Sequence, residues 1–377
     1  MRTDSREEAL APLGFTPFFH QQWLTFIAEN ADSSADVARV VSVRRGDYLL
    51  SNGEGEPRRA TLAGRLAGAS DASYPCVGDF VVVEWGDATG PGRIEQILER
   101  SSLFVRKRPA PSSRPQPIAA NVDLAIVVCA LSVDDADPDV ARRGLNVRRI
   151  ERYLYAIAQA GVTPLVVINK ADLCREARAA TDALRGEMRG VDVLAVSARS
   201  GLGMDLVEER LAPRTTAVLV GASGVGKSSL TNHLLGREAR RAEAIREDDG
   251  RGRHTTTGRD LFALPGGALL IDTPGMRELG LWADEDGTLP IAELVDAFAR
   301  DCRFRDCRHD GEPGCAVAAA VERGELSAPR LEHARKLERE VAWQRARQDA
   351  ALRSQVKKKS RAISRFARER QRAKGKA

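Results

Sequence analysis

The chain has 377 residues, which suggests two or three domains at roughly 150 residues each. Apolar residues make up 43% and charged residues 29%, a composition that supports folded cores and excludes wholesale disorder. The longest apolar run, Leu124–Leu131, has eight residues, whereas a membrane-spanning helix needs about 20. The first residues do not follow the pattern of a signal peptide. We therefore expect a cytoplasmic protein without a membrane segment.

Six cysteines, three of them crowded into residues 302–315, do not form the spacing of a disulfide scaffold. The net charge of +5 hides an asymmetry, because residues 351–377 hold 11 Lys or Arg and one Glu, which leaves −5 for the other 350 residues. A basic tail on a mildly acidic body favours an anionic partner such as nucleic acid. A flexible solubilising tail is the alternative.

Aromatic residues gather near the N-terminus, in a stretch that predicts either a docking helix or a helix packed on its own domain. The stretch contains Leu13, Phe15, Phe18, Phe19, Trp23 and Phe26. From Val37 to Arg108, short alternating apolar segments such as residues 38–43, 79–84 and 93–97 are separated by glycine-rich breaks. This pattern predicts a small all-β barrel of about five strands, whose size fits an OB-fold.

Residues 109–117 contain four prolines and predict a semi-rigid linker. Strand and helix signals then alternate, which predicts a parallel sheet covered by helices on both faces. The expected strands are 122–130, 164–168, 191–196, 217–220 and 268–271, and the expected helices are 147–159, 176–188, 202–211 and 227–235. Beyond Pro290 the sequence becomes helical and contains the clustered cysteines, and from Ser327 a charged helical segment leads into the basic tail.

A phosphate-loop pattern lies between an expected strand and an expected helix, as its mechanism requires. Its glycines let backbone amides curl around phosphates, Lys227 reaches the β and γ oxygens, and the Ser228 hydroxyl ligates Mg²⁺. An ordinary glycine turn is the weaker alternative. The predicted phosphate-binding residues are Gly221, Ala222, Ser223, Gly224, Val225, Gly226, Lys227, Ser228 and Ser229.

The sequence Asn169-Lys170-Ala171-Asp172 follows an expected strand and indicates which base is bound. A carboxylate at Asp172 can accept two hydrogen bonds from guanine N1 and N2, which adenine cannot offer. Ser197-Ala198, after the next strand, resembles the loop whose backbone amide meets guanine O6. Each short motif is weak alone, but together with the phosphate loop they favour GTP.

The remaining nucleotide residues flank the strand that ends at Asp272. The motif Asp272-Thr273-Pro274-Gly275 supplies a Mg²⁺-linked carboxylate at Asp272 and a γ-phosphate-sensing amide at Gly275. Upstream, residues 255–257 are three threonines that offer a switch hydroxyl, which we assign to Thr256 or Thr257.

The order of these motifs is unusual for a GTPase. Asn169 precedes Gly221 by 52 residues and Asp272 follows it by 51, whereas the base-reading motif of ordinary GTPases comes after the phosphate loop. The order predicts a circularly permuted G domain, which keeps the same packed sheet if the original termini lay close together.

Three cysteines and one histidine in the C-terminal part have the spacing of a structural zinc site. The pattern is Cys302-x4-Cys307-x-His309-x5-Cys315, which provides a complete tetrahedral ligand set and leaves no open position for catalysis. Reduced structural cysteines beside a surface histidine are the alternative.

In this combination the motifs resemble the ribosome-small-subunit-dependent GTPase A family (RsgA/YjeQ), over about residues 37–320. The resemblance implies an N-terminal OB-fold, a permuted G domain and a zinc module. It also implies a GTPase that is stimulated by the small (30S) ribosomal subunit, binds its rRNA and acts late in its maturation, with Mg²⁺ and one Zn²⁺ as cofactors. Other assembly factors, such as ribosome-binding factor A, are further expected partners, and we expect a monomer.

With this resemblance, the expected organisation is a multidomain chain of five segments. They are an N-terminal extension (1–34), an all-β OB-fold barrel (35–113), an α/β permuted GTPase domain (114–287), a helical zinc-binding domain (288–350) and the basic tail (351–377). The acidic N-terminus and the basic C-terminus depart from the family pattern, so RNA binding by the tail is an inference from charge alone.

Hydrolysis needs a group that orients the attacking water, and Met276, which occupies the position of the usual glutamine, cannot do so. His254 is the candidate, because the resembled family uses a histidine in this switch and imidazole suits the task near neutral pH. A surface histidine without a role is the alternative. Two other functions stay open: a constitutive RNA-binding scaffold with structural nucleotide, and a permuted GTPase that acts on the large subunit.

Overall fold

The structure is a computed structural model, and it separates the chain into two compact units. The first unit comprises Met1–Gly280 with Gly287–Pro290, and the second comprises Leu281–Asp286 with Ile291–Ala377. The structure describes residues 2–30, 34–44, 47–67, 74–86, 90–106, 116–131, 145–188, 190–236, 259–272, 295, 298–309, 312–323, 325–326, 328, 331–332 and 335.

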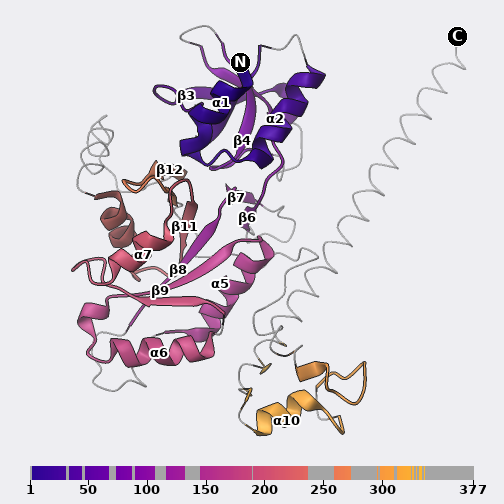
Figure 1. Cartoon of the computed structure of the whole chain (residues 1–377), viewed down its shortest axis with the longest axis vertical. Helices are drawn as coiled ribbons and strands as arrows, with labels where there is room; N and C mark the ends of the chain where they lie inside the picture. The colour runs from indigo at the N-terminus through magenta and orange to yellow at the C-terminus, as the bar shows by residue number, and fades with distance from the viewer. Residues whose placement is uncertain are drawn as a thin grey trace, which may run out of the picture. The chain divides into compact units, whose positions relative to one another are not determined.

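The first unit contains a closed β-barrel in its N-terminal part, which confirms the expected all-β fold (Figure 1). Its strands pair in the circular order β1-β2-β3-β5-β4-β1, so the barrel has no free edge among these strands. They are β1 (Asp36–Arg44), β2 (Asp47–Ser51), β3 (Arg58–Leu62), β4 (Phe80–Glu84) and β5 (Gly92–Ile97), with the short helix α3 (Gly64–Ala67) between β3 and β4.

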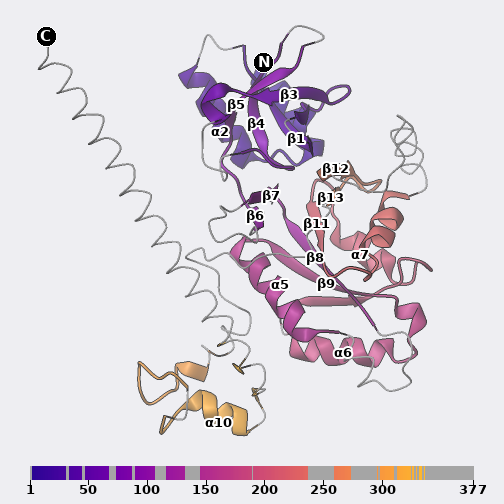
Figure 2. The same ribbon diagram turned by 180° about the vertical axis from the view of Figure 1, so that it is seen from behind.

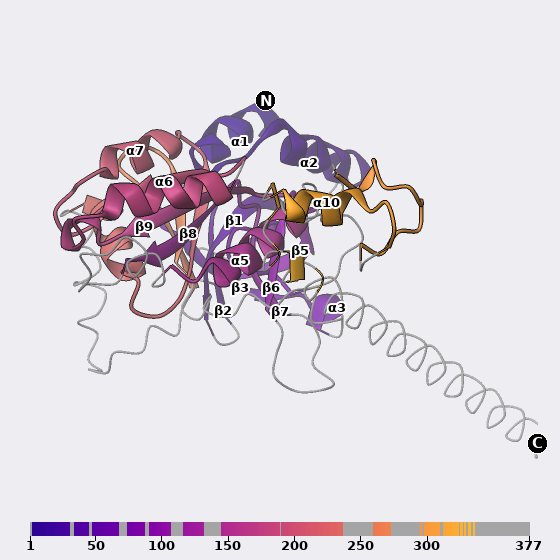
Figure 3. The ribbon, with the colours of Figure 1, turned by 90° about the horizontal axis from the view of Figure 1, so that it is seen from below.

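The aromatic N-terminal stretch packs on the barrel, so the second interpretation of this segment is the correct one. It forms α1 (Arg2–Leu10), the 3-10 turn η1 (Ala11–Leu13) and α2 (Pro17–Glu29), which lie together on one side of the barrel strands (Figure 3). Phe15, Phe19 and Trp23 are buried in one cluster with Phe80 of β4. Burying such side chains contributes about 1.5–3 kcal/mol each.

A buried arginine that the sequence analysis did not single out joins three segments. The Arg39 guanidinium on β1 donates to the backbone oxygens of Leu13, of Gly78 at 3.1 Å and of Asn121 at 3.1 Å. Burial lowers the pKa of Arg39 to about 10, an effect that the nearby Asp123 and Asp79 carboxylates partly offset. The N-terminal turn, the barrel and the start of the following sheet are thus fastened at one point.

The sheet of the expected α/β domain continues from the barrel. In its nucleotide-binding part the strand order is β10-β9-β8-β11-β13-β12, and β12 then pairs with β1 of the barrel (Figure 2). Pairs β10–β9, β9–β8, β8–β11 and β11–β13 are parallel, and only β12 runs antiparallel to its neighbour β13. The strands are β8 (Leu124–Ala130), β9 (Thr163–Asn169), β10 (Asp192–Ala195), β11 (Thr216–Val220), β12 (Arg259–Ala263) and β13 (Leu269–Asp272).

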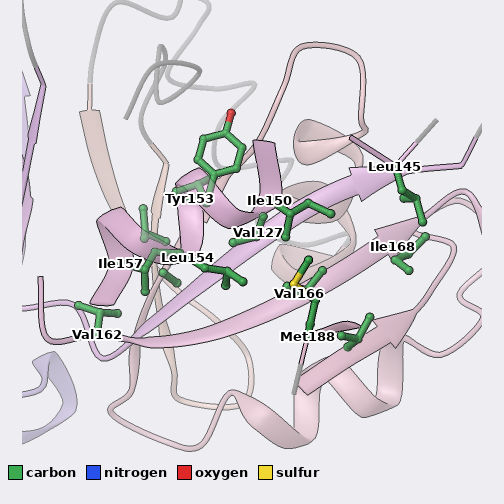
Figure 4. Close-up of a cluster of buried hydrophobic side chains, with 14 of the residues drawn as sticks. Val127, Leu145, Ile150, Tyr153, Leu154, Ile157, Val162, Val166, Ile168 and Met188 are labelled. Carbon is green, nitrogen blue, oxygen red and sulfur yellow. The ribbon is translucent and has the colours of Figure 1, made fainter. Parts of the chain in front are cut away.

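Helices cover both faces of this sheet, as expected for parallel strands. The helices α5 (Val147–Gln159) and α6 (Ala177–Glu187) share one buried cluster with alternate residues of β8 and β9 (Figure 4). On the other face, α7 (Met204–Arg210) and the helix over residues 227–236 pack on the remaining residues of these strands. Two buried clusters therefore hold the strand ends in place.

One two-stranded ladder was not expected from the sequence. The strand β6 (Leu103–Arg106) pairs antiparallel with β7 (Gln116–Ala120), which includes the last residues of the proline-rich segment. In the second unit, α10 (Ala316–Glu322) follows the cysteine cluster. Across the described ranges, none of the helices combines the length and apolar character needed to cross a membrane.

Candidate guanine nucleotide and metal sites

The predicted phosphate loop connects the buried strand β11 to the helix over residues 227–236. The Lys227 ammonium group lies back over this loop and donates to the carbonyl oxygens of Gly221 and Ala222, each at 2.7 Å. The helix begins at Lys227, so its first backbone amides lie beside the loop. Such a helix start binds phosphate through its free N–H groups and the positive end of its dipole.

Two glycines of the loop are required by close contacts with neighbouring strands. Gly226 has φ +96°, and a Cβ atom there would lie 2.2 Å from Nδ2 of Asn169. Gly221 has φ +148°, and its Cβ would lie 2.3 Å from the carbonyl oxygen of Val128 on β8. At both positions the backbone conformation favours glycine, and neighbouring atoms leave no room for a side chain.

The base-reading motif lies directly beside the phosphate loop, although the two are far apart in the sequence. The Asn169 side chain at the end of β9 donates to the carbonyl oxygen of Val225 at 3.0 Å and accepts from the backbone amide of Ala198 at 3.0 Å. The Lys170 ammonium donates to the carbonyl oxygen of Gly224 at 2.9 Å. Asn169 therefore joins the loops that follow β9, β10 and β11, whose strands lie close together in the order β10-β9-β8-β11.

Lys170 adopts a left-handed conformation (φ 65°) that begins the 3-10 turn η3 (Ala171–Leu173). The turn leaves the Asp172 side chain exposed while Ala171 is buried. An exposed carboxylate that is held by a turn beside the phosphate loop has the chemistry needed to accept two N–H donors of a guanine.

The Ser197-Ala198 loop follows β10 and is held from two directions. Ser197 is buried, and its hydroxyl accepts from the backbone amide of Ser200 at 3.1 Å. Nδ1 of His233, on the helix that follows the phosphate loop, lies 3.2 Å from the carbonyl oxygen of Ala198. His233 could not be predicted from the sequence, because no short motif relates a residue in mid-helix to a loop 35 positions earlier.

Asp272 ends β13 at the same edge of the sheet. Burial raises the pKa of its carboxyl group, the charge of Asp260 raises it further, and the charge of Lys227 lowers it. Asp260 lies directly opposite Asp272 on β12. A half-buried carboxylate beside a second carboxylate and a lysine attracts a divalent cation, and the carboxylate and hydroxyl oxygens of Asp272 and Ser228 are the ligands that Mg²⁺ prefers. Asp260 was also missed by the sequence analysis.

Four predicted site residues, His254, Thr256, Thr257 and Gly275, lie outside the described residues, as does Thr255. The basic tail of residues 351–377 lies outside them too. The other predicted nucleotide residues are all described and gather around the ends of β9, β10, β11 and β13.

The four predicted zinc ligands of the second unit come together. One ligand atom each from Cys302, Cys307, His309 and Cys315 lies within 4.8 Å of every other. The sulfur atoms of Cys302 and Cys315 are 4.0 Å apart, and Nδ1 of His309 lies 3.5 Å from each of them. A tetrahedral Zn²⁺ with ordinary bond lengths requires separations of about 3.8 Å between sulfurs and about 3.6 Å between sulfur and nitrogen. The ligand set fits the ion.

Backbone conformation and capping support this cluster. His309 has a positive φ of 61°, and Arg335 donates to its carbonyl oxygen. The Cys315 sulfur caps α10 by accepting from the backbone amide of Ala318 at 3.4 Å. The cluster is therefore fastened to a helix on one side, and its ligand-bearing turns are otherwise polar and part-exposed.

Comparison with known proteins identifies relatives along most of the chain. Residues 97–282 match the family described as RsgA GTPase. The chain is 41% identical to the small ribosomal subunit biogenesis GTPase RsgA of Syntrophotalea carbinolica, over 87% of this chain and 89% of that protein. It is 42% identical to the protein of the same name from Streptomyces avermitilis, over 94% of this chain and 91% of the relative.

Solved structures give the same result. The crystal structure of YjeQ from Thermotoga maritima matches with a TM-score of 0.57 at 27% identity, covering 82% of this chain and 99% of that one. YloQ, described as a circularly permuted GTPase, matches with a TM-score of 0.55 at 26% identity, covering 82% of this chain and 95% of that one. With the predicted base-reading motif bonded to the predicted phosphate loop and relatives of this similarity, the chain belongs to the RsgA family of GTPases.

Proposed function

We propose that the chain is a cytoplasmic GTP hydrolase that is stimulated by the small ribosomal subunit and acts late in the maturation of that subunit. The observation that carries this proposal is the bonding of Asn169 and Lys170 to the phosphate loop, which puts base-reading and phosphate-binding residues into one site. The relatives named small ribosomal subunit biogenesis GTPase support the choice of partner.

In the proposed site the guanine base lies between two loops. Asp172 accepts from guanine N1 and N2, and the Ser197-Ala198 loop lies on the O6 side of the base, while Asn169 holds these loops to the phosphate loop. The residues 221–229 surround the phosphates. Because the base-reading motif precedes the phosphate loop, we infer that the G domain is circularly permuted, in line with the description of YloQ.

Two metal ions belong to the proposal. Ser228, Asp272 and one of Thr256 and Thr257 hold Mg²⁺, which neutralises phosphate charge during hydrolysis, and Gly275 senses the γ-phosphate. Zn²⁺ is held by Cys302, Cys307, His309 and Cys315 and orders the polar turns around them. His254 orients the attacking water.

We assign contact with ribosomal RNA to the N-terminal barrel and the basic tail. The strand order of the barrel, β1-β2-β3-β5-β4-β1, is compatible with an OB-fold, which commonly binds oligonucleotides. The tail carries a net charge of +10 over 27 residues, from 11 basic residues and one Glu, which suits a phosphate backbone. In this scheme the GTP-bound protein binds the immature subunit as a monomer, and hydrolysis releases it.

A GTPase assay with purified small and large ribosomal subunits tests the proposal. We expect slow hydrolysis by the protein alone, strong stimulation by small subunits and none by large subunits. Stimulation by large subunits alone would favour the alternative of a large-subunit factor. In the same assay His254→Ala is expected to lose the stimulated rate, and a variant as active as the wild type would remove His254 from the mechanism.

Binding measurements distinguish the proposed GTPase switch from the alternative of a constitutive RNA-binding scaffold. Small-subunit affinity measured with a non-hydrolysable GTP analogue should exceed the affinity measured with GDP, because a switch binds its partner in one nucleotide state. Equal affinities would mean that the nucleotide has only a structural role.

A further inference from the structure

The strand β12 is shared by the barrel and the nucleotide-binding sheet (Figure 2). On one edge it pairs with β13, from Asp260 opposite Asp272 to Ala263 opposite Leu269. On the other edge it pairs with β1 of the barrel, through Ser42 opposite Asp260 and Val43 opposite Arg259. Ser42, Asp260 and Asp272 therefore stand in one row across three strands.

A β-bulge directs β1 toward this position. Residues 36–39 of β1 pair with β4 inside the barrel, and the register with β2 shifts between Val40 and Ser42. A bulge bends its strand and re-aims the side chains that follow it. Beyond the bulge, Ser42 pairs with Leu49 of β2 on one edge of β1 and with Asp260 of β12 on the other edge, which residues 36–39 share with β4.

The row of Ser42, Asp260 and Asp272 lies on a single face of the sheet, because residues directly opposite each other in antiparallel pairs project to the same side. Their Cβ atoms are about 5 Å apart at each step, so the row spans about 10 Å. This is the face covered by the helix over residues 227–236, whose Leu230 and Leu234 share a buried cluster with Leu270 of β13. The row therefore runs from the barrel strand β1 to β13, on the face covered by the helix that follows the phosphate loop.

The buried hydroxyl of Ser42 is available to form a further hydrogen bond. Its side chain is only 4% exposed, and its Oγ atom has no hydrogen-bond partner among the residues that the structure describes. A buried hydroxyl without a partner costs about 1–3 kcal/mol, so a small movement that gives it an acceptor is favoured. The acceptor directly opposite is the Asp260 carboxylate. On the other face of β12, Arg259 donates to the carbonyl oxygen of Pro117 at 3.0 Å and fastens the same strand.

We propose that Ser42 is a positioning residue of the nucleotide site, whose hydroxyl donates to Asp260 in the Mg²⁺–GTP-bound protein and thereby fixes Asp260 against Asp272. This inference rests on the proposed function, because it takes Asp272 as a residue of the Mg²⁺–GTP site. It makes β12 the physical connection between the barrel and that site. By linkage, a partner that binds the barrel and shifts β1 changes the affinity for Mg²⁺–GTP, and the reverse holds equally.

Nucleotide titration of the full-length protein tests the inference without ribosomal subunits. The variants are Ser42→Ala, Asp260→Ala and the double variant, with Thr61→Ala on the exposed side of β3 as the matched loss of a hydroxyl. Affinity is measured for a non-hydrolysable GTP analogue with Mg²⁺ and for GDP in the presence of a chelator. We expect Ser42→Ala to weaken the former by about tenfold or more, as for loss of a hydrogen bond to a charged group, and the latter by less than about twofold.

The double variant separates positioning from general destabilisation. If Ser42 acts through Asp260, the double variant binds no more weakly than Asp260→Ala alone, whereas independent effects would multiply. Thr61→Ala should behave as the wild type. Amide hydrogen exchange of the wild-type protein gives a second measurement, in which Mg²⁺–GTP analogue should slow exchange at residues 42–43 and 259–261 relative to GDP.

Unchanged affinity in Ser42→Ala, multiplying effects in the double variant, or exchange at residues 42–43 that does not respond to the analogue would each overturn the inference. In these cases the wild type still binds GTP, so the proposed function stands. A wild type that binds no guanine nucleotide in either condition would instead contradict the proposed function and the inference together.

Discussion

The nucleotide site and the Cys/His cluster are both assembled from polar residues on loops, but they reach their geometry by different means. Asn169 contacts the phosphate loop across 56 positions of sequence, and it does so because buried parallel strands place the two loops side by side. The Cys/His ligands lie within 13 positions of one another, and little apolar packing surrounds the turns that carry them. The first site is held by the core, whereas in our proposal the second is ordered by a bound Zn²⁺ ion.

The largest expected effect comes from removing the ion of the cluster. Cys307→Ser, or a strong chelator, should release one equivalent of Zn²⁺ and expose the amides of residues 302–322 to solvent exchange, because structural zinc contributes on the order of 10 kcal/mol to such turns. Metal analysis and hydrogen exchange measure this. Cys174→Ser, a buried cysteine outside the cluster, should keep its zinc.

Guanine nucleotide affinity should survive that change, because the nucleotide-site residues described above all belong to the first compact unit. A Cys307→Ser protein that retains full metal content would contradict the assignment of the ligands. A large parallel loss of GTP affinity would contradict the contrast between the two regions.

A second change is aimed at the contact that joins the two nucleotide motifs. Gly226→Ala should lower guanine nucleotide affinity by about 100-fold or more, because the new Cβ displaces Asn169 and requires a strained backbone. Gly236→Ala is the matched control, since Gly236 ends the same helix with φ +70° and its nearest neighbour is 3.9 Å away. Calorimetric titration that finds equal losses in both variants would show that backbone strain, not the contact, is responsible.

The smallest effect is expected at His233, which contacts the Ala198 loop rather than the predicted nucleotide position itself. His233→Ala should weaken GDP binding by about fivefold, the worth of one neutral hydrogen bond, because the Ala198 loop loses its link to the helix after the phosphate loop. His233→Gln, which keeps a donor on a side chain of similar length, should recover part of the affinity. An alanine variant with wild-type affinity would mean that Asn169 alone holds the loop.

The parts of the molecule that could be predicted from sequence are those with a local signal. Strand and helix alternation predicted the sheet, and dense motifs predicted the phosphate loop and the cysteine cluster. Asp260 and His233 could not be predicted, because their places beside the site come from cross-strand register and helix packing, which no short sequence motif encodes. Arg39 escaped for a related reason, since a buried arginine with three carbonyl partners looks like any other charged residue within a strand.

The central claim is that Asp172 and the phosphate loop bind one guanine nucleotide, and base selectivity tests it most directly. Calorimetric titration of Asp172→Asn with guanosine and xanthosine triphosphates should show affinity lost for the first and gained for the second, because the amide can donate to the extra oxygen of xanthine. The phosphate contacts stay the same in both titrations. A variant that keeps the wild-type preference for GTP would contradict the claim.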